Sequence, residues 1–149
     1  CSYVGDFISC IHILAACWFV NLLCLFGDIL SDQAAGLVGG LGLAPGLNVG
    51  DNFLLAQATH GSAPDLEGQN MANPVAEILS AKLMIEWLGI RYEDKIASQA
   101  ALLIEKSVAD VLRNGKKTVD IGGNLGTVEF GKILCETIRV NGYSWLNKV

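Results

Sequence analysis

Apolar residues recur with the spacing of an α-helix in three segments of the second half of the chain, at about 73–89, 93–114 and from 127 onward. Each segment has one apolar side, which we expect to face the core. The expected core residues are Val75, Ile78, Leu79, Ile85 and Leu88 in the first helix, Ile96, Ala100, Ile104, Val108 and Val111 in the second, and Phe130, Ile133, Leu134 and Ile138 in the third.

The residues at the ends of these segments are typical of helix boundaries. Asn73 is expected to cap the first helix, with Pro74 at its first position and Gly89 ending it. Gly115 is expected to stop the second helix, and Thr127 to cap the third.

Strands are predicted between and before the helices. Residues 51–59 alternate loosely and predict a strand, residues 60–72 form a polar loop, and residues 118–121 predict a second short strand. The stretch 27–50 holds seven glycines, too many for an ordinary helix throughout. Strands alternating with helices indicate an α/β domain.

The beginning of the chain differs from the rest. Residues 7–27 carry no charge over 21 positions, which is long enough to span a bilayer. His12 and Asn21 interrupt the stretch and no Lys or Arg flanks it, so the features of a membrane span or signal peptide are incomplete. A membrane span, a buried strand–helix segment and a damaged or wrongly assigned N-terminus stay open. We treat residues 1–24 as an apolar stretch whose authenticity is open, and residues 25–149 as the domain.

Composition limits the classes of function. The chain has 149 residues, of which 52% are hydrophobic and 17% charged, which fits one globular domain and excludes a disordered chain. Its net charge of -5 argues against a nucleic-acid partner. The first residue is Cys1 rather than Met, which favours a fragment, a processed product or a partial gene prediction.

Three cysteines, Cys10, Cys17 and Cys24, recur every seven residues. On a helix they would lie about 10.5 Å apart, too far to share a zinc ion or form a disulfide. We interpret them as small buried apolar residues, and reduced thiols fit a cytoplasmic or mitochondrial-matrix compartment.

Asp28 and Asp32 form the first candidate site. At a spacing of four they would project from one face of a helix, among apolar neighbours. A divalent cation such as Mg²⁺ or Mn²⁺ would relieve their repulsion and use both carboxylates as ligands. The alternative is that Asp28 is a helix cap and Asp32 is merely exposed.

The loop after the predicted strand forms the second candidate site. It contains His60-Gly61-Ser62-Ala63-Pro64-Asp65 and closes at Asn73. Such a loop can bring backbone amides, an imidazole and a carboxylate around a small ligand, and Asp65 could accept hydrogen bonds from the hydroxyls of a ribose. The alternative is a simple turn, with His60 bonded to nearby backbone.

Five motifs together resemble the isocitrate/isopropylmalate dehydrogenase family of β-decarboxylating dehydrogenases. The resemblance covers about three quarters of the chain and implies an α/β fold of the isopropylmalate dehydrogenase type, which is not a Rossmann fold. The motifs, in chain order, are Gly27-Asp28-Ile29-Leu30-Ser31-Asp32, Gly39-Gly40-Leu41-Gly42-Leu43-Ala44-Pro45, His60 to Asp65, Ala72-Asn73-Pro74 and Asp120-Ile121-Gly122-Gly123-Asn124.

The resemblance implies a reaction and its cofactors. Such enzymes oxidise the hydroxyl of a 3-substituted malate by hydride transfer to NAD or NADP, and the β-keto acid then loses carbon dioxide. Asp28 and Asp32 match the family's metal-ligand aspartates for Mg²⁺ or Mn²⁺, and the loop His60–Asp65 with Asn73 matches its adenosine-binding part. Asp65 stands where NADP users commonly carry Lys, which implies NAD because a carboxylate would repel a 2′-phosphate.

The resemblance also implies what this chain does not supply. The family's polypeptide is more than twice as long, and the substrate arginines, the catalytic Tyr and Lys and a third metal aspartate from the dimer partner lie in its other part. Cys24 stands where the family usually has Asn, and Gln57 where it often has Glu. This chain is therefore expected to be the C-terminal portion of a homodimeric or larger enzyme, with no catalytic residue of its own and inactive alone. The substrate, 3-isopropylmalate, isocitrate, homoisocitrate or tartrate, stays open.

Two other functions compete with this one. The first is a truncated, non-catalytic regulatory or scaffold subunit, attached to a membrane through residues 7–27. The second is a bare nucleotide-binding module that uses the His60–Asp65 loop.

Overall fold

The computed structural model of the chain describes residues 29, 32–37 and 39–146, with side chains as far as Tyr143. The cysteines at 10, 17 and 24, the aspartate at 28 and the apolar stretch 7–27 lie outside these residues. Among the described residues no helix is both long and apolar enough to cross a membrane.

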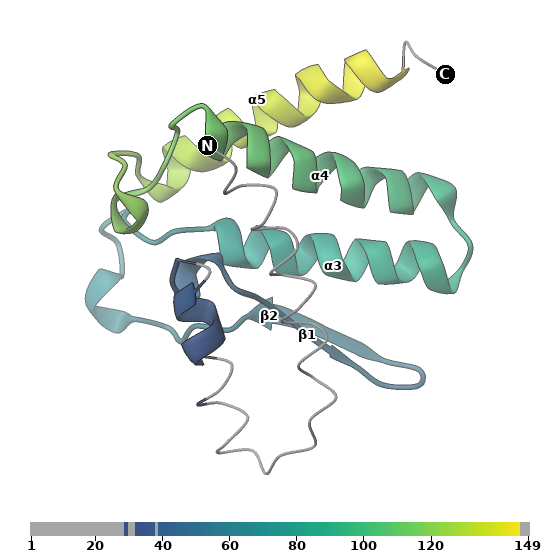
Figure 1. Cartoon of the computed structure of the whole chain (residues 1–149), viewed down its shortest axis with the longest axis horizontal. Coiled ribbons are helices and arrows are strands. Elements are labelled where there is room, and N and C mark those ends of the chain that lie inside the picture. The colour runs from purple at the N-terminus through teal and green to yellow at the C-terminus, as the bar shows by residue number, and fades with distance from the viewer. Residues whose placement is uncertain (1–28, 30–31, 38, 147–149) are drawn as a thin grey trace.

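Three long helices and one hairpin make up most of the described part. The helices are α3 (Val75–Arg91), α4 (Lys95–Arg113) and α5 (Thr127–Leu146), and the hairpin pairs β1 (Pro45–Val49) with β2 (Leu54–Ala58) in antiparallel register. Helix α3 packs against the hairpin and against α4, and α4 packs against α5. The result is a layered α/β arrangement, as predicted (Figure 1).

The core lies where the helices meet the 3-10 turn Leu41–Leu43 that precedes β1. Phe130 and Val75 are fully buried. The other buried members of the cluster are Leu43, Leu79, Val108, Val111 and Leu134. The predicted core side of each helix is confirmed, with two exceptions: Ile96, in the first turn of α4, is 78% exposed, and Leu88, near the end of α3, is 38% exposed.

Polar side chains of α3 fasten the hairpin. Ser80 Oγ, fully buried, accepts a hydrogen bond from Gly46 N (3.1 Å), and Glu77 Oε2 accepts one from Ala58 N (2.8 Å). At the hairpin tip, Arg91 donates to the carbonyl of Asp51, and its guanidinium lies 5.0 Å from the ring centre of Trp87. These bonds satisfy backbone groups that a two-stranded sheet leaves unpaired.

The turn between α3 and α4 differs from the prediction. Gly89 does not end α3, which continues to Arg91. A Cβ on Gly89 would lie 2.4 Å from Ser98 Oγ and 2.7 Å from Ser98 N, so this glycine permits the close approach of α4 rather than a left-handed cap. Asp94 caps α4, and its carboxylate accepts hydrogen bonds from Ile96 N and Ala97 N.

The strand predictions were partly wrong. Residues 54–58 are the strand expected within 51–59, but β1 was not predicted, because Pro45 and Gly46 belong to a glycine-rich stretch. The strand expected at 118–121 is a 3-10 turn, Val119–Ile121, because Gly122, at φ 79°, closes it and returns the chain on itself. In this region Thr118 pairs with Leu125 in an isolated parallel β-bridge.

Candidate functional site

The polar loop between β2 and α3 is open to solvent. Residues 59–72 are all exposed, and the loop holds the 3-10 turn Pro64–Leu66. Asp65 lies in this turn, and its carboxylate makes no hydrogen bond to any residue that the structure describes. His60 Nδ1 lies 3.0 Å from the carbonyl oxygen of Gly61, so the imidazole is bonded to nearby backbone, as the simpler alternative expected.

Asn73 joins this loop to two other parts of the chain. Its Oδ1 accepts a hydrogen bond from Val75 N (3.0 Å), so it stabilises the first turn of α3, although Pro74 rather than Asn73 is the cap residue itself. Its Nδ2 donates to Asp120 Oδ2 (2.9 Å), 47 residues away. The amide therefore has a fixed orientation, and its second N–H has no hydrogen-bond partner among the residues that the structure describes.

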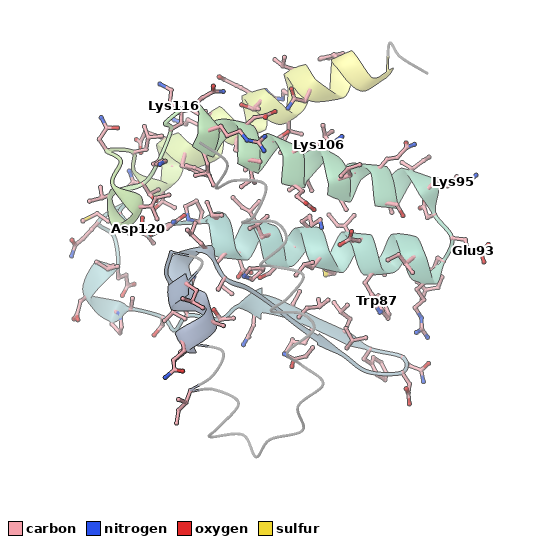
Figure 2. All side chains as sticks on the ribbon, viewed as in Figure 1. Trp87, Glu93, Lys95, Lys106, Lys116 and Asp120 are labelled. Carbon is pink, nitrogen blue, oxygen red and sulfur yellow. The ribbon has the colours of Figure 1, made fainter. Side chains whose placement is uncertain are left out.

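Gly42 lies against the same pair. A Cβ on Gly42 would lie 3.1 Å from Asp120 Oδ2 and 3.3 Å from Asn73 Cβ, so a larger residue would press on both. Three motifs that are remote in sequence thus meet at one point. Figure 2 shows Asp120 on the turn between α4 and α5, at the end of the molecule where α3 and α5 begin.

The turn that carries Asp120 is internally fixed. Thr118, which is fully buried, donates from Oγ1 to Asp120 Oδ1, while its carbonyl accepts from Ile121 N and Gly123 N. Both carboxylate oxygens of Asp120 therefore accept a hydrogen bond, one from Thr118 and one from Asn73. The carboxylate is therefore held in position although Asp120 is exposed to solvent.

The loop is also fastened to the first turn of α5. Asn70 bonds three successive residues there, Thr127, Val128 and Glu129. The side chain of Thr127 donates to the carbonyl of Ala72 rather than capping its own helix, so the predicted cap was wrong. Glu129 is exposed, and the hydrogen bond from Asn70, then its own backbone N–H, hold the pKa of its carboxyl below the ordinary value of 4.5. That stabilising contribution is present at neutral pH and is lost as the pH falls through the lowered pKa.

The predicted metal pair is half described. Asp32 is exposed on the helical residues 32–37, while Asp28 lies outside the described residues. Among the described residues no three His, Cys, Asp or Glu side chains gather as a metal cluster. An exposed carboxylate is the oxygen ligand that Mg²⁺ or Mn²⁺ prefers, so Asp32 fits the donor chemistry of such a site.

Sequence reasoning predicted the loop and Asn73 but not its contacts. Gly42, Asn70 and Asp120 were not among the predicted site residues, although Gly42 and Asp120 stood in the quoted motifs. The one local signal for Asn70 is its residue type, because Asn tolerates the left-handed backbone that it adopts here at φ 56°.

Comparison with solved structures identifies the class of fold. The chain superposes on the isocitrate dehydrogenase of Methylococcus capsulatus with a TM-score of 0.68 and 42% identity, covering 77% of this chain and 33% of that one. A β-decarboxylating dehydrogenase of Thermococcus kodakarensis matches with a TM-score of 0.66 and 37% identity, covering 77% and 32%. The described part is therefore a piece of a decarboxylating-dehydrogenase fold.

Sequence comparison identifies the family. The isocitrate/isopropylmalate dehydrogenase family model matches residues 20–134. The 3-isopropylmalate/3-methylmalate dehydrogenase of Methanocaldococcus jannaschii is 52% identical over 77% of this chain and 32% of its own length. The isocitrate/homoisocitrate dehydrogenase of Thermus thermophilus is 48% identical over the same shares. This chain belongs to the isocitrate/isopropylmalate dehydrogenase family, and it spans about a third of the length of the curated relatives it matches.

Proposed function

We propose that this chain is the cofactor-binding and metal-binding portion of an enzyme that oxidises and decarboxylates a 3-substituted malate with NAD. One observation carries the proposal: Gly42, Asn73 and Asp120, from three family motifs, meet where the exposed polar loop 59–72, which contains His60 to Asp65, joins α3. Residues 25–149 would form the C-terminal part of the enzyme, and hydride would pass from the substrate hydroxyl carbon to the nicotinamide before carbon dioxide leaves.

The loop and Asn73 would hold the adenosine half of NAD. The Asp65 carboxylate would accept hydrogen bonds from the two ribose hydroxyls, since it has no other partner among the described residues. Asn73 would offer its remaining amide hydrogen, because its orientation is fixed by Val75 and Asp120. His60 to Pro64 would line the same site with backbone groups.

Asp28 and Asp32 would hold the divalent ion. When bound, Mg²⁺ or Mn²⁺ supplies a Lewis acid for the substrate oxygen. The two carboxylates would supply negative charge and oxygen ligands to the ion, and they would take no other part in the reaction. A chain that binds both groups but lacks the proton-transfer pair is expected to be inactive alone.

The substrate and setting are proposals of the same kind. Isocitrate and 3-isopropylmalate are the leading substrates, in an enzyme that works as a homodimer or larger in the cytoplasm or the mitochondrial matrix. The names of the relatives include 3-isopropylmalate, isocitrate and homoisocitrate dehydrogenases, among them a mitochondrial NAD enzyme of Arabidopsis thaliana. They support the reaction class and leave the side chain of the malate open.

Binding and turnover by the whole chain test the proposal. We expect NAD⁺ to shift the amide NMR signals of the His60–Asp65 loop, of Asn73 and of Asp120, and Mn²⁺ to broaden the signals near Asp32. We expect no NADH formation from isocitrate or 3-isopropylmalate. Absence of NAD⁺-dependent shifts at the loop would contradict the cofactor site, and turnover would contradict the dependence on other segments.

Asp65→Lys is expected to exchange the cofactor preference. Loss of the charge-assisted ribose bonds should weaken NAD⁺ binding about tenfold, and the new ammonium should strengthen NADP⁺ binding by a similar factor. Asp65→Asn is the matched control, because it removes the repulsion without adding a positive charge. NMR titration with both dinucleotides measures the ratio of NAD⁺ affinity to NADP⁺ affinity. An unchanged ratio in Asp65→Lys would mean that the 2′-hydroxyl of the ribose does not lie at Asp65.

A further inference from the structure

Asn70 connects the polar loop 59–72 to α5 through three hydrogen bonds, which use its carbonyl oxygen and both polar atoms of its side chain. Its carbonyl oxygen accepts from Thr127 N (3.0 Å), its Oδ1 accepts from Val128 N (2.9 Å) and its Nδ2 donates to Glu129 Oε2 (2.9 Å). The N–H groups at the start of a helix have no partner within the helix. Asn70 precedes Thr127 by 57 residues and Val128 by 58. It therefore supplies the hydrogen-bond acceptors that a helix cap normally supplies from the adjacent residue.

The residues on both sides of Asn70 continue this connection. Gln69 Nε2 donates to the carbonyl oxygen of Asp65 (2.5 Å), and the Ala72 carbonyl accepts from Thr127 Oγ1. Asp65 is thus hydrogen-bonded to Gln69, and Asn70, which follows Gln69, is hydrogen-bonded to α5. A shift of α5 relative to the loop would move Asp65 and the base of the loop together.

The contact is tight and needs particular residues. Asn70 has φ 56°, a left-handed backbone that Asn adopts more easily than most residues. On the other side, a Cβ on Gly126 would lie 2.7 Å from the carbonyl oxygen of Asn70, a backbone atom, and would also press on Asn70 Nδ2 and Glu129 Oε2. Any residue larger than glycine at 126 would therefore separate the loop from the helix.

We propose that Asn70 is a positioning residue for the cofactor: it holds the loop against α5, so that Asp65 and Asn73 keep the spacing that the adenosine requires. This inference rests on the proposed function and adds a residue that does not itself touch the ligand. Its effect should appear in dinucleotide affinity, because a loop that must be ordered at the moment of binding lowers that affinity.

The hydrogen bond between Asn70 and Glu129 offers a selective test, because its polarity can be reversed. Asn70→Asp keeps the acceptor for Val128 N but sets two carboxylates against each other. We expect it to weaken NAD⁺ binding about tenfold at pH 7. Adding Glu129→Gln supplies an amide donor to the new carboxylate, and the double variant is expected to bind within about twofold of the wild type.

The pH profile separates positioning from general loss of stability. Lowering the pH toward 5 should restore part of the NAD⁺ affinity of Asn70→Asp, since protonation of either carboxyl removes the repulsion. The positive charge that acts on the Glu129 carboxylate is Lys132, one turn further along α5. The wild type should change little over this range. Asp94→Ala is the matched control, because it removes a comparable cap from α4, remote from the loop, and should leave the affinity within about twofold while lowering the melting temperature.

NMR titration with NAD⁺ and hydrogen exchange at the Val128 amide give the readouts. Weaker binding and faster exchange in Asn70→Ala, with rescue of Asn70→Asp by Glu129→Gln, support the proposal. A wild-type chain that binds NAD⁺ and an Asn70→Asp chain that binds equally well would overturn the positioning role alone. A wild-type chain that does not bind NAD⁺ at the loop would overturn the proposed function and the positioning role with it.

Discussion

Replacing Lys82 with methionine is expected to lower the free energy of unfolding by about 3 kcal/mol. Lys82 lies inside α3 and is 5% exposed, and its ammonium contacts Glu86 Oε2 at 2.9 Å and, across the helix interface, Glu105 Oε2 of α4 at 2.5 Å. Removal of the ammonium leaves the Glu105 carboxylate, whose side chain is 17% exposed, without its partner. Glu86 is 37% exposed and water can solvate it, which places the loss at the lower end of the range for broken buried pairs.

Urea unfolding of the whole chain measures this loss. Lys95→Met, at the exposed start of α4 (Figure 2), is the control and should change stability by less than about 0.5 kcal/mol. A second substitution, Glu105→Leu, should recover much of the stability lost by Lys82→Met, because an apolar pair then replaces the ion pair. If Lys82→Met unfolds at the same urea concentration as the wild type, the ion pair does not hold α3 to α4.

The pH dependence of this effect has a definite sign. Burial by itself lowers the pKa of Lys82, but the hydrogen bonds and charges of Glu105 and Glu86 outweigh it, so the pKa lies above its ordinary value of 10.5. A raised pKa means that the contribution is complete below the unfolded value and is lost as the pH rises through the folded one. The difference between wild type and Lys82→Met should therefore be constant from about pH 6 to about pH 9 and shrink only in stronger alkali.

The helices could be predicted because their cores follow the sequence period. The buried sides of α3, α4 and α5 match the apolar spacing, and their ends fall within a few residues of the predicted ones. Gly89 was misassigned because a glycine near a helix end has two uses, a left-handed cap and a close contact, and only the position of Ser98 decides between them. The strand β1 was missed for a related reason, since Gly46 faces the carbonyl of Gln57, where a Cβ would lie 2.6 Å away.

The candidate site was predicted in its local parts and not in its long-range contacts. The loop, Asn73 and Asp65 are contiguous in sequence, and turn residues mark them. The bonds of Asn73 to Asp120 and of Asn70 to α5 join residues 47 and 58 positions apart. Single-residue types carry no signal for such pairs, because an Asn and an Asp can satisfy their hydrogen bonds with many partners. The roles of Asp28, Asp32 and the loop in binding metal and NAD stay predictions.

Gly123→Ala is expected to cost about 3 kcal/mol of unfolding free energy and to abolish NAD⁺ binding to the loop. A Cβ on Gly123 would lie 2.0 Å from the Lys117 carbonyl oxygen and 2.3 Å from its carbon, which are backbone atoms that no rotamer change can move. The same carbonyl accepts the hydrogen bond from Leu125 N (3.0 Å). Relief of the clash must therefore open the turn that carries Thr118 and Asp120, and with it the Asn73 contact.

Gly122→Ala provides a matched control one residue away. No atom lies within 4 Å of a Cβ on Gly122, so its cost comes only from the left-handed backbone at φ 79° and should be about 1 kcal/mol. Because that substitution leaves the Lys117 carbonyl in place, the Asp120 turn should keep its form and NAD⁺ should bind within about threefold of the wild type. Equal losses of stability and of NAD⁺ affinity in the two variants would mean that backbone strain, rather than the contact between Gly123 and Lys117, sets the position of Asp120.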